Sequence, residues 1–294
     1  MDMKKMLKGY ALVMLSAILY GCMPLGAKFI YANGVNHLSL VLYRNLLLLP
    51  LLLVILKIKG EPLSITKKQA AHIAPVALMG LCVTPILLYA SYNYISSGMA
   101  TTLHFVYPAF VALGGAVFLG EKLRPSHILC VVLCTVGAGL FYSPDGSFDP
   151  LGSALAVLSA VTMAAYVLLL GKLHLEGVSS TKYCFYNCLT ASIVALIACV
   201  VSGELTLPGN GLCWLACLAF SLFISYGAVN LFQQGSYIIG GQKASILSTF
   251  EPITSLVIGV WVFNESFSPM ALLGAALIVA ATALVALADL KTSK

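Results

Sequence analysis

The sequence predicts an all-α membrane protein of ten transmembrane helices, built as a 5+5 inverted-topology repeat with both termini cytoplasmic. Three observations support this fold class. First, 60% of the 294 residues are apolar and only 9% are charged, whereas about a quarter of the residues in soluble chains are charged. Second, Lys and Arg are absent from every second connection. Third, the second half of the chain repeats the first.

Ten apolar runs are long enough to cross about 30 Å of hydrocarbon at about 1.5 Å per helical residue. The first run follows a basic start similar to a signal peptide, but it continues past Gly26 without a small-x-small cleavage site, so we expect a permanent helix. The runs leave no room for a separate soluble domain, and the expected location is the cytoplasmic (inner) membrane, multi-pass. The predicted spans are 9–30, 38–56, 72–94, 99–119, 126–142, 151–171, 183–201, 212–236, 244–263 and 269–288.

The basic residues orient the chain. Fourteen of the sixteen Lys and Arg residues lie in the termini and in alternate connections, which predicts that these segments are cytoplasmic. The other connections contain no Lys or Arg, and their only charged residues are four acids in the last three of them: 31–37, 95–98, 143–150, 202–211 and 264–268. Only Lys28 and Arg44 break the pattern. Because the basic residues are scattered over short loops with no exposed aromatic platform, no nucleic-acid partner is expected.

The two halves, 1–145 and 146–294, are related by an offset of 143 to 144 residues. The stretch Gly9–Ala17 matches Gly152–Ala160, and further matches are Tyr43 with Tyr186, Ala100 with Ala244, Pro108 with Pro252, Glu121 with Glu265, Pro125 with Pro269 and Leu129 with Leu273. An odd number of helices per half makes equivalent helices run in opposite directions. Alternating-access transporters are built on such repeats, with the substrate near the midplane.

The sequence also resembles a known family. The runs that carry the resemblance are Tyr20-Gly-Cys-Met-Pro-Leu-Gly-Ala-Lys28, Leu42-Tyr-Arg44, Gly98–Pro108 and Phe118-Leu-Gly-Glu-Lys-Leu123, with Phe250-Glu-Pro252 and Val262-Phe-Asn-Glu265 in the second half. They are similar to the EamA-like branch of the drug/metabolite transporter superfamily over essentially the whole chain. The resemblance implies a 5+5 inverted fold and proton-linked or facilitated movement of small metabolites, often outward. One departure is Asn264, where the family usually has Gly.

Two basic residues fall inside predicted spans, where a charge costs at least about 2.5 kcal/mol. Lys28 is near the outer end of its span, so it either snorkels to the interface or attracts an anion and takes part in gating. Arg44 is about six residues from the outer end, too deep for easy snorkelling. Its planar fork suits both a structural hydrogen-bond hub and a substrate-binding or gating role.

Glu251 is the acid deepest inside a predicted span, directly before Pro252 and equivalent to Tyr107. A carboxyl group in low dielectric holds its proton more tightly and can exchange it for an ammonium-bearing ligand, so we predict Glu251 as a substrate and proton-coupling site. The alternative is a carboxylate locked to Lys28, Arg44 or a backbone donor. His104 is either a proton relay or a neutral, hydrogen-bonded histidine.

Two polar stripes at helical spacing are candidate cavity linings. One contains Tyr89 and Asn93 with Tyr92 and Ser96; the other contains Tyr226, Asn230, Gln233 or Gln234, and Tyr237. Amides and phenols donate and accept hydrogen bonds, which suits an amphoteric or aromatic metabolite, although such stripes also hold helices together. Pro108 and Pro252 are candidate hinges or static bends.

The nine cysteines include three pairs four residues apart, but we interpret them as small packing residues and predict no metal or other cofactor. The predicted function is a secondary transporter, an exporter of small polar or amphoteric metabolites such as amino acids. An organic-cation or drug exporter is the alternative. An intramembrane enzyme lacks an HExxH or GxSxG motif, and a receptor would not require the repeat. The expected partners are a small-molecule substrate and the lipid bilayer, with the chain a monomer or homodimer.

Overall fold

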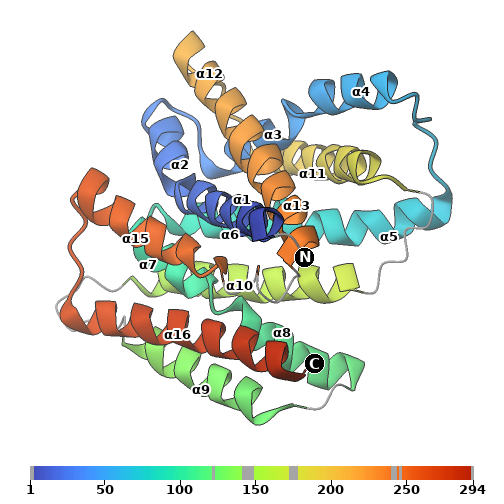
Figure 1. The fold of residues 1–294 in the computed structure, drawn as a ribbon. Coiled ribbons are helices and arrows are strands. Elements are labelled where there is room, and N and C mark those ends of the chain that lie inside the picture. Colours follow the sequence, from blue (N-terminus) through green and yellow to red (C-terminus); the bar gives the residue numbers. More distant parts are fainter. Residues whose placement is uncertain are drawn as a thin grey trace.

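A computed structural model describes residues 3–120, 123–140, 149–171, 178–239, 244 and 247–292, and every regular element in these ranges is a helix (Figure 1). Four residues that support the predicted repeat and charge pattern lie outside the described ranges: Glu121, Lys122, Lys172 and Lys243. The elements are α1 (Met3–Gly21), α2 (Met23–Ala32), α3 (His37–Leu46), α4 (Leu49–Ile58), α5 (Lys67–Ala77), η1 (Leu78–Val83), α6 (Thr84–Ser91), α7 (Ser97–His104), α8 (Tyr107–Leu119), α9 (Pro125–Gly139), α10 (Pro150–Gly171), α11 (Ser180–Ser202), α12 (Gly211–Phe220), η2 (Ser221–Ala228), α13 (Val229–Ile239), α15 (Phe250–Phe263) and α16 (Pro269–Thr292).

Seven stretches of continuous or nearly continuous helix are long and apolar enough to cross a membrane. They run over Lys4–Ala32, His37–Ile58, Lys67–Ser91, Ser97–Leu119, Pro150–Leu170, Ser180–Ser202 and Gly211–Ile239. Three further apolar helices are shorter: Pro125–Gly139, Phe250–Phe263 and Pro269–Leu284. The chain is therefore a multi-pass, all-helical membrane protein in its described part.

Several predicted spans are interrupted rather than straight. Pro24 and Pro50 each stand at the start of a new helix, α2 and α4, because proline cannot supply the amide that the preceding turn needs. Pro108 likewise begins α8 after a break at Phe105–Val106, and a turn at Ser248–Thr249 precedes α15. Glu251 consequently lies in the first turn of α15 and not in the middle of a continuous helix, as the 244–263 span had predicted.

Two π-helices occupy equivalent positions in the two halves. The helix η1 begins at Leu78 and η2 begins at Ser221, 143 residues later. Each sits in the middle of a long helix, with α5 and α6 around η1, and α12 and α13 around η2. Because π-helical turns are rare and concentrate at functional positions, their recurrence at the repeat offset indicates that equivalent helices of the two halves have the same backbone conformation.

The helices pack in pairs that the repeat relates to each other. The segment α1 packs on α13 and α15, and its counterpart α10 packs on α6 and α8. Two further contacts join equivalent helices directly, α3 with α11 and α9 with α16, and α7 packs on α15, the counterpart of α8. Figure 1 shows α9 and α16 side by side along one flank of the bundle. Gly137 and Gly274 allow that contact, since a Cβ atom on Gly274 would lie 2.5 Å from the Gly137 carbonyl oxygen.

The main apolar core lies between α2, α3, α6 and α7, where Ile30, Leu40, Tyr89 and Leu103 are buried. This core surrounds the polar groups described next. In Figure 1 the turn between α15 and α16 and the start of α10 lie at the left, whereas the connection from α4 to α5 and the end of α8 lie at the right.

Candidate functional site

Glu251 stands among tyrosines at the start of α15. Its carboxylate lies within electrostatic range of the hydroxyl groups of Tyr20, Tyr89, Tyr92 and Tyr107. In the part of the chain that the structure describes, no side chain or backbone donor is hydrogen-bonded or ion-paired to this carboxylate. The arrangement therefore leaves the carboxyl oxygens of Glu251 available to a ligand.

Arg44 sits in a tight hydrogen-bonded cluster on the inner side of α3. Its Nε donates to Ser225 Oγ at 2.9 Å, and its Nη1 donates to the Tyr89 hydroxyl. The guanidinium also lies 5.6 Å from the ring centroid of Tyr89 and 5.8 Å from that of Phe220. The Arg44 carbonyl accepts a bond of 2.8 Å from Ser221 Oγ. Arg44 thus ties α3 to α6, α12 and η2, which is the hub geometry anticipated from its planar fork.

Tyr20 connects the basic and acidic groups. It lies within electrostatic range of Arg44, Glu251 and Tyr89, at the end of α1. Tyr89 is fully buried and donates to Met23 Sδ at 3.2 Å. Tyr20 and Tyr89 therefore lie near both a guanidinium and a carboxyl group, and these groups together have the chemistry to recognise both ends of an amphoteric molecule.

His104 is buried at the end of α7 and contacts α10. Its Nδ1 lies 2.8 Å from Ser159 Oγ, and Ser159 Oγ donates to the Ala156 carbonyl at 2.6 Å. Because the single hydroxyl proton of Ser159 is used in the second bond, Nδ1 of His104 acts as the donor in the first. Tyr107 follows at a ring distance of 6.0 Å from His104. His104 therefore has a structural partner, while Tyr107 faces the Glu251 neighbourhood.

The other predicted lining residues lie elsewhere. The helix α6 ends at Ser91, so Asn93 falls in a turn and lines a shallow pocket of about 250 Å³ with Tyr31, Asn36 and His37. Ser96 caps the next helix, where its Oγ accepts from the Met99 amide. The predicted stripe on a single helix is thus divided between two elements.

The stripe in the second half is also dispersed. Tyr226 packs against the apolar cluster of Leu48, Leu52 and Cys188, and the Asn230 side-chain amide donates to the Tyr226 carbonyl at 2.8 Å. Gln233 is exposed on α13. Of the residues predicted for the site, the structure therefore gathers Arg44, Tyr89, Tyr107 and Glu251 and leaves Asn93, Tyr226, Asn230 and Gln233 outside that group.

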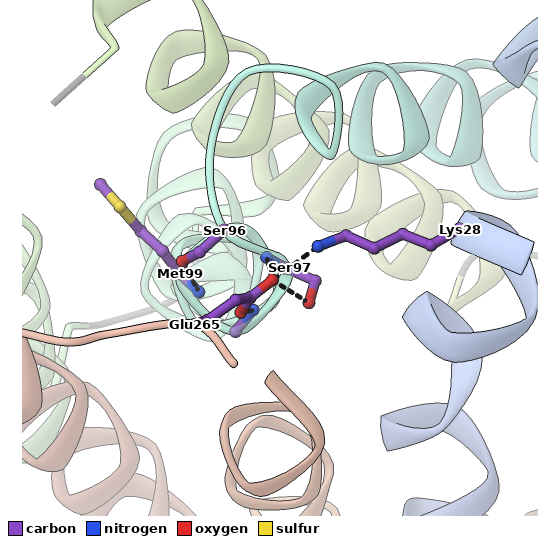
Figure 2. A network of polar contacts seen from close by, with 6 residues as sticks. Lys28, Ser96, Ser97, Met99 and Glu265 are labelled. Atoms are coloured by element: carbon purple, nitrogen blue, oxygen red, sulfur yellow. Dashed lines mark hydrogen bonds and ion pairs between the residues drawn. The ribbon is translucent and has the colours of Figure 1, made fainter. Parts of the chain in front are cut away.

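Lys28 forms a second polar cluster with residues from three elements (Figure 2). Its Nζ lies 2.6 Å from Glu265 Oε1, and the same carboxylate accepts from the amide and hydroxyl of Ser97, both at 2.9 Å, and from the Gly98 amide at 3.4 Å. Lys28 Nζ also lies 4.3 Å from the Phe263 ring centroid. We call Lys28, Ser97 and Glu265 the latch. It joins α2, α7 and the segment after α15.

The latch keeps Glu265 charged. Partial burial of the carboxyl group alone would raise its pKa, but the hydrogen bonds from Lys28 and Ser97 outweigh this and hold the pKa below its ordinary value. The amides of Ser97 and Gly98 form the start of α7, where the helix dipole favours an anion. The charge of Lys28 is therefore neutralised within the protein and needs no other anion.

The sequence did not identify several side chains that take part in these clusters. The sequence marked Glu265 as the repeat partner of Glu121 and as the end of the run Val262-Phe-Asn-Glu265, but not as a partner of Lys28, which is 237 residues away and beyond the reach of any local pattern. Nothing in the sequence marks Ser221 and Ser225 as partners of Arg44, since serines are common in membrane helices. Tyr20 stood inside the run Tyr20–Lys28, but its proximity to Glu251 depends on how α1 packs against α15.

Metal ligation has no support in the described ranges, where no three His, Cys, Asp or Glu side chains come together in a way that holds an ion. Cys130 and Cys134 lie on one face of the same helix, with their Sγ atoms 3.9 Å apart.

Known proteins resemble the whole chain. The chain is 22% identical to an uncharacterized transporter of Clostridium kluyveri over 93% of this chain and 91% of that protein. It is 25% identical to an uncharacterized inner membrane transporter of Salmonella typhimurium, over 95% of each. A probable terminal-alkyne amino-acid exporter of Streptantibioticus cattleyicolor is 26% identical over 79% of each chain.

A solved crystal structure has the same fold, with a TM-score of 0.66, 17% identity, and coverage of 97% of this chain and 99% of that chain. The sequence profile of the EamA-like transporter family matches residues 7–143 and again residues 150–287. These two matches together span almost the entire chain, so it belongs to the EamA-like transporter family.

Proposed function

We propose that this transporter exports small polar or amphoteric metabolites, such as amino acids, across the cytoplasmic membrane by alternating access. The proposal includes ten transmembrane helices in two inverted halves, 1–145 and 146–294, with both termini cytoplasmic. The paired π-helices and the matched packing of the two halves support the inverted repeat. The name of the Streptantibioticus relative supports an amino-acid-like substrate.

The observation that carries the proposal is the carboxyl group of Glu251, which is unpaired among the described residues and lies near Tyr20 and Tyr89 of the Arg44 cluster. In the protonated state, Glu251 is neutral among the phenols; after losing its proton it attracts an ammonium group. A proton and an amine therefore compete for one site, which couples metabolite movement to a proton gradient. Arg44 and Tyr107 supply hydrogen-bond donors toward the rest of the substrate, and the Tyr89 hydroxyl, whose proton goes to Met23 Sδ, supplies an acceptor.

One observation favours a second candidate, an organic-cation exporter. Arg44 already donates to Ser225 and Tyr89 and lies over two aromatic rings. Because these bonds occupy Arg44, the Glu251 carboxyl group and the surrounding phenols are the groups left to bind a ligand. Such a site also suits a cation that has no carboxylate.

The test is uptake by purified protein in liposomes, screened over amino acids, purines and organic cations, with and without a pH gradient. Glu251→Gln preserves the shape of the side chain and removes the exchangeable charge, so we expect uptake to be lost or to become independent of the gradient. Tyr226→Phe, outside the gathered group, serves as the control. Wild-type rates and gradient dependence in Glu251→Gln would exclude the proton site, and the substrate that is taken up decides between the two candidates.

A further inference from the structure

Two matching sets of hydrogen bonds hold opposite ends of α11. At the C-terminal end, the Tyr43 hydroxyl donates to the Thr206 carbonyl at 2.8 Å, and the Asn36 side chain donates to the Glu204 carbonyl at 2.5 Å. We call these contacts the first clasp. It fastens the beginning of α3 to the segment 204–209 that follows α11.

At the N-terminal end of α11, the Tyr186 hydroxyl donates to the Leu63 carbonyl, and Ser179 Oγ donates to the Glu61 carboxylate. We call these contacts the second clasp. It fastens the beginning of α11 to the segment 61–66 that follows α4.

The clasps join repeat-equivalent residues, although Glu204 accepts through its backbone carbonyl and Glu61 through its carboxylate. Tyr43 and Tyr186 are 143 positions apart, and so are Leu63 and Thr206. The same offset relates Asn36 to Ser179 and Glu61 to Glu204. Asn36 and Ser179 even have the same capping role, since each accepts from the amide three residues later. Both clasps are closed in one and the same conformation.

The latch lacks this symmetry. The repeat equivalent of Lys28 at the 143-residue offset is Gly171, which has no side chain to pair with an acid. Among the described residues, the latch contact therefore occurs at one end of the bundle only.

Inverted repeats alternate access when the two halves exchange conformations. A contact that is closed in both halves at once is unchanged by that exchange. A contact that is closed at one end only must open when access moves to that end. We infer that α3, α4 and α11 with the segments 61–66 and 204–209 form a frame that stays closed through the whole cycle, while the latch opens. This inference rests on the proposed alternating-access transport.

The first clasp can be locked with a native cysteine. Ser39 Oγ lies 4.0 Å from Cys199 Sγ, beside the first clasp, so Ser39→Cys places two thiols within reach of a disulfide. The repeat-equivalent lock for the second clasp is Leu56→Cys with Lys182→Cys. We expect oxidised and reduced forms of each variant to take up substrate at equal rates. The matched control is Ser39→Cys with Cys199→Ser. This variant is treated with the same oxidant but cannot form the disulfide between positions 39 and 199.

The latch is locked by Lys28→Cys with Glu265→Cys and a short reducible thiol cross-linker. Uptake is expected to be lost on cross-linking and to return on reduction. Loss of uptake after oxidation of Ser39→Cys, reversed by reduction, would overturn the frame, and full uptake through a cross-linked latch would overturn the opening of the latch. Failure of every reduced protein to transport would instead contradict the proposed function.

Hydrogen exchange on the unmodified protein tests the frame without any substrate. The Thr206 amide donates to Ser39 Oγ at 2.9 Å in the frame, and the Ser97 amide donates to Glu265 in the latch. We expect slow exchange at Thr206 and faster exchange at Ser97, since only the latch opens in the cycle. Faster exchange at Thr206 than at Ser97 contradicts the inference.

Discussion

Arg44 and Lys28 are the two basic residues that the charge pattern singled out, and their surroundings differ. Lys28 is paired with an acid, whereas Arg44 is satisfied by hydroxyl groups and aromatic faces. A carboxylate partner neutralises charge, but hydroxyl partners leave the positive potential of Arg44 in place. Arg44 therefore braces the helices and keeps its positive charge.

Replacing Arg44 should lower the stability of the protein, because its hydrogen bonds join several helices. Arg44→Ala removes two hydrogen bonds made by a charged donor, each of which stabilises a fold by about 1.5–3 kcal/mol. We expect a clear drop in melting temperature in detergent, and Arg44→Lys should recover only part of it because a lysine cannot form the fork. Ser225→Ala, which removes one acceptor, should have the smaller effect. A melting temperature for Arg44→Ala equal to that of the wild type would contradict the hub.

Glu265 should make stability depend on pH in the acid range. Its folded-state pKa lies below the ordinary value of 4.5, so its contribution to stability is present above that pH and is lost as the pH falls through the folded-state pKa. We expect the melting temperature of the wild type to fall in this range. In Glu265→Gln it should be lower at neutral pH and change less on acidification.

The control for this titration is Glu204→Gln, because the Glu204 side chain is exposed and only its backbone carbonyl enters the first clasp. Its acid profile should follow the wild type. Identical profiles for Glu265→Gln and the wild type would mean that the latch carboxylate makes no contribution to stability.

The ends of α8 and α15 show how an element tolerates a change in sequence. Gly120 ends α8 in the left-handed region with φ 68°, and Asn264 ends α15 there with φ 52°. Glycine has no Cβ penalty in this region, and asparagine is among the few other residues that adopt it readily. The departure of Asn264 from the family pattern therefore preserves the turn that delivers Glu265 to Lys28.

Alanine should expose this requirement at both ends. Gly120→Ala and Asn264→Ala should each destabilise the protein by about 1–2 kcal/mol, the cost of a left-handed residue with a Cβ. Among the described residues beyond the adjoining backbone, no atom lies within 4 Å of a Cβ built on Gly120, so the effect there is conformational and not a clash. Asn264→Gly should be close to neutral. Thermal denaturation of the three variants measures this, and a loss in Asn264→Gly as large as in Asn264→Ala would contradict the argument.

The arrangement of the whole molecule makes a prediction about sidedness. Ser64 and Leu207 are exposed, lie in equivalent connections, and are 143 positions apart. If the halves are inverted with cytoplasmic termini, Leu207→Cys reacts with a membrane-impermeant thiol reagent added outside intact cells, and Ser64→Cys reacts only after permeabilisation. The wild-type cysteines give the background. Labelling of both variants from the same side would contradict the inverted repeat.

The sequence by itself determined the class of the molecule. Hydropathy, the alternation of basic and non-basic connections and the offset of the two halves are local or periodic properties of the sequence, so they can be read without knowing how the helices pack. Glu251 was also identified in this way, because an acid in an apolar run is costly wherever the helix packs. The proline breaks at Pro24, Pro50 and Pro108 follow from the chemistry of proline, although the breaks themselves had been expected only at Pro108 and Pro252.

Only the tertiary structure decided which polar groups meet. Lys28 and Glu265 are 237 positions apart, Arg44 and Ser225 are 181 apart, and nothing local marks either pair. The turn after Ser91 likewise removed Asn93 from the stripe that helical spacing had predicted. The physical reason is the same in each case: a membrane sets the depth and direction of a helix, whereas its rotation and its neighbours are set by side-chain packing over the whole bundle.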